Sequence, residues 1–272
     1  MKVLNKIMAI SSGRISLKYI AEFYNFNRYE TKILIPYYLS NCILDTICKY
    51  VYPVTDTRIK HSVLFVYHQF GYRQVEEVFE YGRNKNLIII EDCANMTPSN
   101  NVTGDVAFFS LSKFFNYNDG LIITANKEFQ VMMMSKYNTL SNKILYNIVK
   151  YTRQYALESD ILTSMLYSIY QFIDYFPEVK ISKLKLNSNI LNVCKLLEIK
   201  TPPHRFVFDN TIQLNDKHHF EYYRFDKNRN MLNPSFELLP ALSYDRLKED
   251  QRLLDVVARN KSSFIVDGLT RI

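Results

Sequence analysis

The feature that most constrains the fold is a set of short apolar runs in the first 125 residues, each of strand length. Within these runs apolar side chains do not alternate with polar ones, so both faces of each strand are expected to be buried. Such runs, separated by helical sequence, indicate an α/β fold with a mainly parallel sheet sandwiched by helices. The predicted strands are Lys32–Ile35, Val63–Tyr67, Leu87–Ile90, Val106–Ser110 and Leu121–Thr124.

The sequence between two pairs of these runs predicts helices, over Leu39–Tyr50 and over Arg73–Asn84. After Asn126 the pattern changes to long helical stretches rich in Tyr, Lys and Asn. It breaks at the Pro202-Pro203 pair and is irregular and polar until Tyr244–Asn260, which is predicted to form one amphipathic helix.

These changes of pattern predict three parts. They are an α/β domain core over residues 1–125, a helical connection over residues 126–200, and a small C-terminal portion over residues 201–272. In the connection, apolar residues recur with helical spacing over Ile161–Phe176. We expect that helix to be buried or to face another subunit rather than a membrane surface.

The charge balance leaves several classes of partner open. Lys and Arg number 34 against 27 Asp and Glu, a formal charge of +7, which suits an anionic ligand or nucleic acid but also an ordinary basic protein. No basic stripe or finger spacing supports nucleic-acid binding. No apolar run is long enough for a membrane span, and Met1–Ile10 lacks the apolar core of a signal peptide.

Cysteine and histidine usage argues against disulfides and metal sites. The four cysteines form no CxxC pair, and the adjacent His218 and His219 would point in different directions. We therefore expect no metal and a reducing, cytoplasmic location.

Candidate chemistry lies where the predicted strands end, because ligands of open α/β sheets bind beyond the carboxyl ends of the strands. The turn over Ser11–Leu17 could present backbone N–H groups to a phosphate, or could simply cap a helix. Asp92 comes after a buried strand and could face a cationic partner or cap a helix after it. Lys113 comes three residues after Ser110 and is flanked by apolar residues. It could snorkel at the surface, or be a desolvated amine suited to covalent chemistry with a carbonyl group.

Taken together, these segments resemble the DegT/DnrJ/StrS-type sugar aminotransferases. That family uses pyridoxal 5′-phosphate (PLP) on the fold of the aspartate aminotransferases. The resemblance runs from Ser11 to Ala125 and rests on order and spacing. The matching segments are Ser12–Leu17, Ile33–Tyr38, Val66–Gly71, Ile90–Asn95, Gly104–Ser110 and Asp119–Thr124.

The resemblance implies roles for particular residues. Asp92 would pair with the pyridinium nitrogen of PLP, and Lys113 would hold the cofactor and later move the proton between substrate and cofactor. Asn95 stands near the expected place of the ring hydroxyl. The phosphate would be held by Ser110 and by the backbone amides of Gly13, Arg14 and Ile15.

This chain departs from the common family pattern in three respects. The spacing between Ser110 and Lys113 is shorter than usual and is similar to a subgroup with a Ser-Leu-Arg-Lys arrangement. Leu121 replaces a second glycine, and the chain is shorter than typical members, with no recognised motif in its C-terminal portion.

The expected function is a PLP-dependent aminotransferase that moves an amino group from an amino acid donor to a keto sugar. The keto sugar is expected to be nucleotide-linked, and the reaction to serve amino-sugar or surface polysaccharide biosynthesis. The resemblance also implies a homodimer and an α+β C-terminal portion that is reduced in size.

Two other functions stay open. The first is a catalytically inactive, shortened relative that acts as a binding or scaffold subunit. The second is an unrelated nucleotide-sugar transferase, which would need an Asp-x-Asp motif that this sequence lacks. Dinucleotide and P-loop motifs are absent too.

Overall fold

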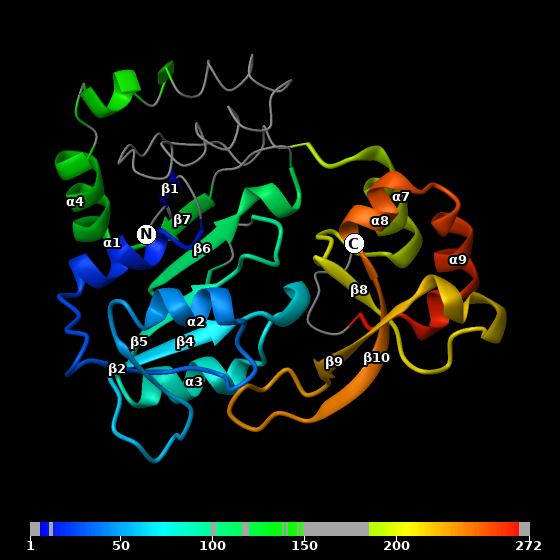
Figure 1. The fold of residues 1–272 in the computed structure, drawn as a ribbon, viewed down its shortest axis with the longest axis horizontal. Helices are drawn as coiled ribbons and strands as arrows, with labels where there is room; N and C mark the ends of the chain where they lie inside the picture. The colour runs from blue at the N-terminus through cyan, green and yellow to red at the C-terminus, as the bar shows by residue number, and fades with distance from the viewer. Residues whose placement is uncertain are drawn as a thin grey trace.

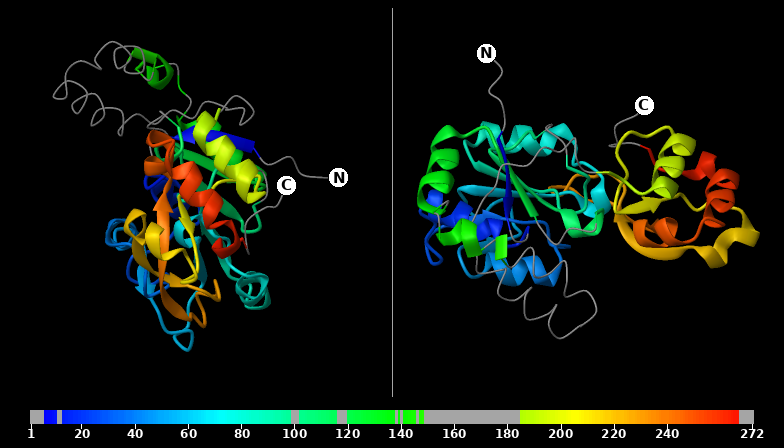
Figure 2. Two further views of the ribbon diagram at one scale, coloured as in Figure 1. Left: turned by 90° about the vertical axis from the view of Figure 1, so that its right-hand side faces the viewer. Right: turned by 90° about the horizontal axis from the view of Figure 1, so that it is seen from above.

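The computed structural model describes residues 6–10, 13–98, 102–115, 120–137, 139, 141–145, 147–148 and 185–266. These residues form two lobes that lie side by side (Figures 1 and 2). The predicted helix over Ile161–Phe176 lies outside the described residues. None of the described helices is both long and apolar enough to cross a membrane.

The first lobe is built on a seven-stranded sheet with the order β1-β7-β6-β5-β4-β2-β3. β2 to β6 are parallel to one another, and β1 and β6 are each antiparallel to β7. Six strands therefore run in one direction, and the prediction of a mainly parallel sheet is confirmed. The strands are β1 (Lys6–Ile10), β2 (Lys32–Leu34), β3 (Tyr52–Val54), β4 (Val63–Tyr67), β5 (Ile88–Asp92), β6 (Val106–Ser110) and β7 (Gly120–Thr124).

Helices cover both faces of this sheet, as expected for α/β architecture. On one face, apolar side chains of α1, α2 and α4 pack with strand residues such as Phe65 and Phe108. On the other face, Val78 and Phe79 of α3 pack against β4 and β5. The helices of this lobe are α1 (Ser16–Phe23), α2 (Asn41–Ile47), α3 (Glu76–Asn84) and α4 (Lys127–Tyr137), with short 3-10 turns at η1 (Gln69–Gly71) and η2 (Leu111–Lys113).

Two strands of this sheet were missed in the sequence. β1 lies at one edge, within Met1–Ile10, for which the sequence analysis predicted no strand. β3 lies at the other edge and contains Pro53. Proline cannot donate a ladder hydrogen bond and is tolerated at sheet edges, so its presence hides a short edge strand from pattern analysis.

The second lobe holds a three-stranded antiparallel sheet with the order β8-β10-β9. Its strands are β8 (Arg205–Val207), β9 (Glu221–Asp226) and β10 (Phe236–Ser243). Its helices are α7 (Ser188–Leu197), α8 (Tyr244–Glu249) and α9 (Leu253–Arg259), with 3-10 turns η4 (Leu214–His219) and η5 (Lys261–Ser263). Residues 201–243 are thus more regular than the sequence indicated. In β9 the exposed Tyr222 and the buried Asp226 break the alternation of apolar and polar residues that would reveal a strand.

The prediction of one helix over Tyr244–Asn260 was wrong, because the chain forms two helices with a break at Asp250. The Asp250 carboxylate accepts hydrogen bonds from the backbone N–H and the guanidinium of Arg252. A carboxylate that bonds the backbone two residues ahead favours a turn over a continuing helix.

The loop between β4 and α3 joins the two lobes. The Gln69 side chain accepts from the Asp226 N–H and donates to the Arg224 carbonyl, each at 2.9 Å. Tyr72, which is buried, accepts a hydrogen bond from the backbone N–H of Val207 through its hydroxyl at 2.9 Å. These contacts hold β8 and β9 beside the carboxyl ends of the first lobe's strands (Figure 1).

Candidate active site

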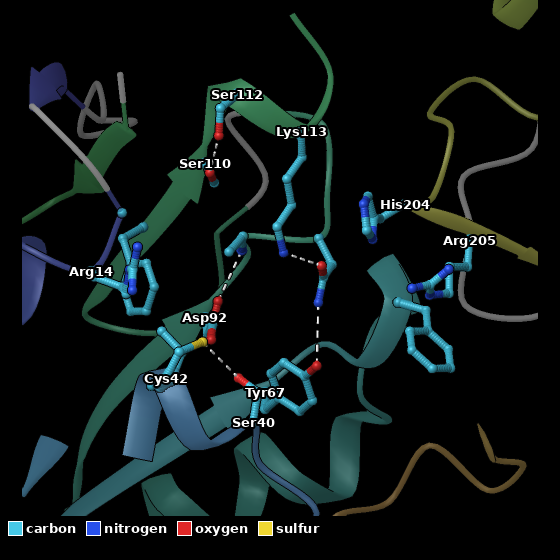
Figure 3. Close-up of a pocket in the computed structure, with 16 residues that line it drawn as sticks. Arg14, Ser40, Cys42, Tyr67, Asp92, Ser110, Ser112, Lys113, His204 and Arg205 are labelled. Carbon is cyan, nitrogen blue, oxygen red and sulfur yellow. Dashed lines mark hydrogen bonds between the residues drawn. The ribbon is translucent and has the colours of Figure 1, made fainter. Parts of the chain in front are cut away.

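A cavity of about 460 Å³ lies at the carboxyl ends of the parallel strands, between the two lobes. Its lining comes from the β1–α1 turn, the start of α2, the ends of β4, β5 and β6, η2, and the start of β8. This is the place where open α/β sheets bind ligands, and the volume falls in the range of roughly 300–1,000 Å³ typical of small-molecule sites. Figure 3 shows the side chains that line it.

At one end of the cavity, the turn after β1 approaches the end of β6. A Cβ atom on Gly13 would lie 3.1 Å from the Phe109 carbonyl oxygen, so glycine allows this close approach. Gly13, Arg14 and Ser110 all line the cavity, and the Ser110 hydroxyl lies 3.0 Å from that of Ser112. Hydroxyls, a guanidinium and a glycine turn make this end suited to an anion.

Ile15 does not line the cavity, although the sequence groups it with Gly13 and Arg14. It packs against the hydrophobic cluster on one face of the sheet. Ser11, Ser12 and Asp119, which belong to the resembling segments, lie outside the described residues.

Asp92 ends β5 and is 1% exposed. Its Oδ1 accepts a hydrogen bond from the Ala94 N–H at 2.9 Å. Its Oδ2 is buried and has no hydrogen-bond partner among the described residues. The described residues directly after it, up to Pro98, form a turn rather than a helix, so Asp92 caps a turn with one oxygen only. Burial raises the pKa of this carboxyl group, although the nearby Lys113 opposes that effect. A buried carboxylate oxygen without a partner indicates a place for a cationic or hydrogen-donating ligand.

Lys113 ends η2 and extends into the cavity (Figure 3). Its Nζ donates to Asn95 Oδ1 at 2.5 Å, and Asn95 Nδ2 donates to the Tyr67 hydroxyl at 3.3 Å. Burial lowers the pKa of the Lys113 amine, and the charge of Asp92 only partly offsets this effect. The amine is therefore oriented by a neutral side chain and its charged form is disfavoured, which favours the desolvated-amine interpretation over surface snorkelling.

A second layer of polar side chains supports the end of β5. His68 Nδ1 accepts from the Gln74 N–H at 3.1 Å, so His68 Nε2 donates to Glu91 Oε2 at 3.0 Å. Glu91 Oε1 accepts from the N–H groups of Thr103 and Gly104. Burial raises the pKa of Glu91, but these hydrogen bonds and His68 outweigh it and lower the pKa overall. An ionised Glu91 thus links the β4 and β5 ends to the loop before β6.

Among the lining residues that the sequence analysis did not propose, Tyr67, His204 and Arg205 bear most on the chemistry of the cavity. Tyr67 ends β4 at the same sheet edge as Asp92, and this position could have identified it. His204 and Arg205 come from the second lobe and line the opposite side of the cavity from Arg14 (Figure 3). No local pattern identifies these two residues, since only the long-range contact between the lobes brings them to the site.

The structure therefore gathers six of the seven candidate residues around one cavity: Gly13, Arg14, Asp92, Asn95, Ser110 and Lys113. The cavity thus combines an end suited to an anion, the buried carboxylate of Asp92 and the desolvated amine of Lys113. Such a site can bind an anionic, electron-poor ligand and exchange a proton at an amine.

Comparisons with known proteins identify the family to which this chain belongs. A family model described as "Putative PLP-dependent aminotransferase" matches residues 3–167, more than half of the chain. A search of curated proteins finds no match.

Among solved structures, similarity is seen to "Putative sugar aminotransferase Spr1654" from Streptococcus pneumoniae, with 11% identity, coverage of 94% of this chain and 88% of that chain, and a TM-score of 0.47. DesV from S. venezuelae has 16% identity, coverage of 49% and 44%, and a TM-score of 0.40. NtdA from Bacillus subtilis has 13% identity, coverage of 47% and 36%, and a TM-score of 0.40. The aligned part thus spans less than half of the last two proteins.

The match to the family model includes the β1–α1 turn and the strand ends that carry Asp92, Ser110 and Lys113. This chain belongs to the family of PLP-dependent aminotransferases.

Proposed function

We propose that this protein is a PLP-dependent aminotransferase that transfers an amino group from an amino acid to a keto sugar. The observation that carries the proposal is that Asp92 and Lys113 line one cavity, one with a buried, unpartnered carboxylate oxygen and the other with a desolvated amine. These are the two side-chain types that chemistry on a pyridine ring with a carbonyl substituent requires.

The residues present fit the cofactor. Asp92 Oδ2 can accept the N–H of the pyridine ring, and the charged ring nitrogen would supply the cationic partner that the buried carboxylate lacks. Gly13, Arg14 and Ser110 would hold the phosphate at their end of the cavity. When bound, PLP supplies the electron sink that stabilises a substrate carbanion.

The protein's own groups then orient the cofactor and move a proton. The depressed pKa of Lys113 keeps a fraction of its amine neutral, so Nζ would be able to hold a carbonyl group covalently, with the carbonyl oxygen leaving as water, and later to accept and return a proton. Asn95 orients that amine through its Oδ1, and the Tyr67 hydroxyl fixes Asn95. An ionised Asp92 would favour the protonated form of the ring, and the charge of the ring nitrogen would offset the effect of burial on the Asp92 pKa.

Two properties support a keto sugar as the amino acceptor. The sequence segments resemble sugar aminotransferases, and the cavity lining is rich in hydroxyl, amide, imidazole and guanidinium groups that can hydrogen-bond sugar hydroxyls. A nucleotide-linked sugar would add a diphosphate, for which the cavity offers Arg205 at the end away from Arg14. We propose that the product serves amino-sugar or surface polysaccharide synthesis in the cytoplasm.

We also propose that the protein acts as a homodimer, as the family resemblance implies. Size-exclusion chromatography with light scattering should give twice the mass of one 32.2 kDa chain. A monomer that turns over substrate would contradict this part of the proposal.

Spectroscopy and turnover test the activity. Added PLP should give the purified protein a yellow colour with a visible absorption band, and Lys113→Ala should abolish that band. Lys127→Ala, at a lysine at the start of α4 outside the cavity, is the matched control and should keep it.

Glutamate and a nucleotide-linked keto sugar should then yield 2-oxoglutarate and an amino sugar. A protein that stays colourless with PLP contradicts the proposal. Binding of PLP without turnover of any keto sugar would instead identify the inactive, binding-subunit relative.

A further inference from the structure

The cavity has two cationic ends. Figure 3 shows Arg14 on one side and Arg205 on the other, with Asp92 and Lys113 between them. PLP carries one phosphate group, and the proposed function places it at the Arg14 end, where Ser110 and Gly13 also lie. Arg205 therefore faces the part of the cavity that remains for a substrate.

Arg205 is held in place before any ligand binds. Its guanidinium carbon lies 4.1 Å from the centre of the Tyr223 ring and 5.5 Å from that of Phe70, and Glu221 is 3.9 Å away. The Arg205 side chain is only 22% exposed. Among the hydrogen bonds of the described residues, none is donated by its guanidinium, so its donors are available to an oxyanion at little further cost in side-chain entropy.

His204, beside it, is fixed through its backbone. The His204 N–H lies 2.9 Å from the Phe70 carbonyl oxygen and 3.1 Å from that of Asn95, and two prolines precede it. Its ring lines the cavity and stands edge-on to Phe114, with the centroids 6.3 Å apart. No hydrogen bond of the ring is found among the described residues.

The imidazole of His204 is neutral in the working range of most enzymes. Burial, with the Lys113 charge as a smaller cause, lowers the pKa of His204 to about 4. A neutral imidazole offers one donor and one acceptor, which suits an uncharged hydroxyl or carbonyl group. The guanidinium of Arg205 suits a phosphate or carboxylate. The two neighbours thus present different chemistry to the same cavity.

Resting on the proposed function, we propose that His204 and Arg205 form the substrate-recognition subsite, with His204 binding a substrate hydroxyl and Arg205 binding a substrate oxyanion. The substrate class is therefore a hydroxylated compound. The same cavity also binds a phosphate or carboxylate group of a substrate. The oxyanion comes from the diphosphate of a nucleotide-linked sugar or from the carboxylate of the amino donor. Two unreactive probes separate these sources.

The test uses the PLP-loaded protein and isothermal titration calorimetry. UDP-glucose represents the nucleotide sugar, UDP the same anion without the sugar, and glutarate the donor carboxylates without an amino group. Arg205→Gln should weaken binding of UDP-glucose or of glutarate by roughly tenfold or more, and the probe affected identifies the oxyanion. His204→Phe should weaken binding of UDP-glucose but not of UDP, and His204→Gln should restore part of the loss.

Arg224→Gln is the matched control. Arg224 also stacks on an aromatic ring, that of Phe236 at 4.3 Å, but it is exposed and does not line the cavity. Its variant should bind all probes as the wild type does. Absorption of bound PLP and a thermal melt, measured for each variant, establish that the cavity and the fold are intact.

Three results would overturn the inference. One is an Arg205→Gln protein that binds PLP and has wild-type affinity, within about twofold, for both UDP-glucose and glutarate. Another is a His204→Phe protein that loses affinity for UDP as much as for UDP-glucose. The third is a PLP-loaded wild type that binds no probe. A wild type that binds no PLP would contradict the proposed function itself, which separates the two failures.

Discussion

At the scale of single residues, the two carboxylate oxygens of Asp92 have different environments, one structural and one suited to a ligand. Oδ1 accepts the Ala94 N–H and shapes the turn after β5, whereas Oδ2 has no partner among the described residues. Protein structures rarely leave a buried carboxylate oxygen in this state, because desolvation without a hydrogen bond is costly. In the proposed function that oxygen meets the cofactor ring, so removing the charge should have opposite effects on stability and on binding.

Asp92→Asn is therefore predicted to stabilise the cofactor-free protein at neutral pH and to weaken PLP binding. Burial raises the Asp92 pKa, so the stability associated with its neutral form is lost as pH rises through the folded-state pKa. The gain in melting temperature of Asp92→Asn over the wild type should vanish at pH values below 3.8, the ordinary pKa of an Asp carboxyl group. PLP affinity should fall by roughly tenfold to a hundredfold.

Thermal melts across pH and PLP titration test this prediction, with Asp45→Asn, a carboxyl on α2 outside the cavity, as the neutral control. A variant that binds PLP as tightly as the wild type would contradict the role assigned to Asp92.

His204 gives a second prediction, on acid stability. Its pKa of about 4 lies below the ordinary 6.5, so the unfolded chain binds its proton first as pH falls. The corresponding stability is complete above pH 6.5 and is lost between 6.5 and about 4. His204→Gln should reduce that loss by up to about 3 kcal/mol. Denaturant unfolding at several pH values measures this change, and equal pH slopes for variant and wild type would count against a half-buried, neutral imidazole at His204.

At the scale of elements, the loop between β4 and α3 sets the distance between the lobes. Tyr72, Gln69 and Gly71 lie in this short stretch, and each meets backbone of the second lobe. A Cβ atom on Gly71, whose φ is +100°, would lie 2.9 Å from Cα of Pro203, so only glycine fits this contact without strain.

Tyr72→Phe is predicted to destabilise the protein by about 1–3 kcal/mol, because it leaves the buried Val207 N–H without its acceptor. Tyr29→Phe, at a side chain that is 83% exposed, should change the free energy of unfolding by less than about 0.5 kcal/mol. Urea denaturation of both variants provides the comparison, and equal effects would show that the Tyr72 hydroxyl does not link the lobes.

The strands of the first lobe could be predicted from sequence because burial on both faces leaves continuous apolar runs. β4 and β6 have the predicted bounds, and β5 begins within one residue of the predicted strand. The edge strand β3 could not, since only three of its residues pair with β2 and one of them is Pro53. The edge strand β1 was not predicted either, although all five of its residues pair with β7. In the second lobe, the exposed Tyr222 and the buried Asp226 of β9 break the alternation expected of a strand. The turn at Asp250 depends on local hydrogen bonds of its carboxylate, which helical periodicity does not reveal.

The residues of the site also fall into those that the sequence could predict and those that it could not. Asp92, Ser110 and Lys113 could be proposed because they come at or after the ends of predicted strands at one sheet edge, where topology brings strand ends together. His204 and Arg205 could not, because their place depends on contacts between segments far apart in the chain. The partly buried Ile15 side chain packs against the hydrophobic cluster, and the role of its backbone N–H at a phosphate stays a prediction.

At the scale of the whole molecule, the cavity exists only because both lobes contribute to it. The first lobe provides the anion end, Asp92 and Lys113, and the second lobe provides His204 and Arg205. The first lobe alone would leave the Lys113 amine more exposed to water and its pKa less depressed. The chemistry proposed for Lys113 would thus depend on the contact between the lobes as well as on the strand ends.

The central claim is that Lys113 is the residue that holds PLP. The most direct measurement is borohydride reduction of the PLP-treated protein, followed by digestion and mass spectrometry of the lysine-containing peptides. We predict one pyridoxyl group per chain, attached at Lys113, and none in the same region of Lys113→Ala. A label spread over lysines outside the cavity such as Lys127, or no label at all, would contradict it.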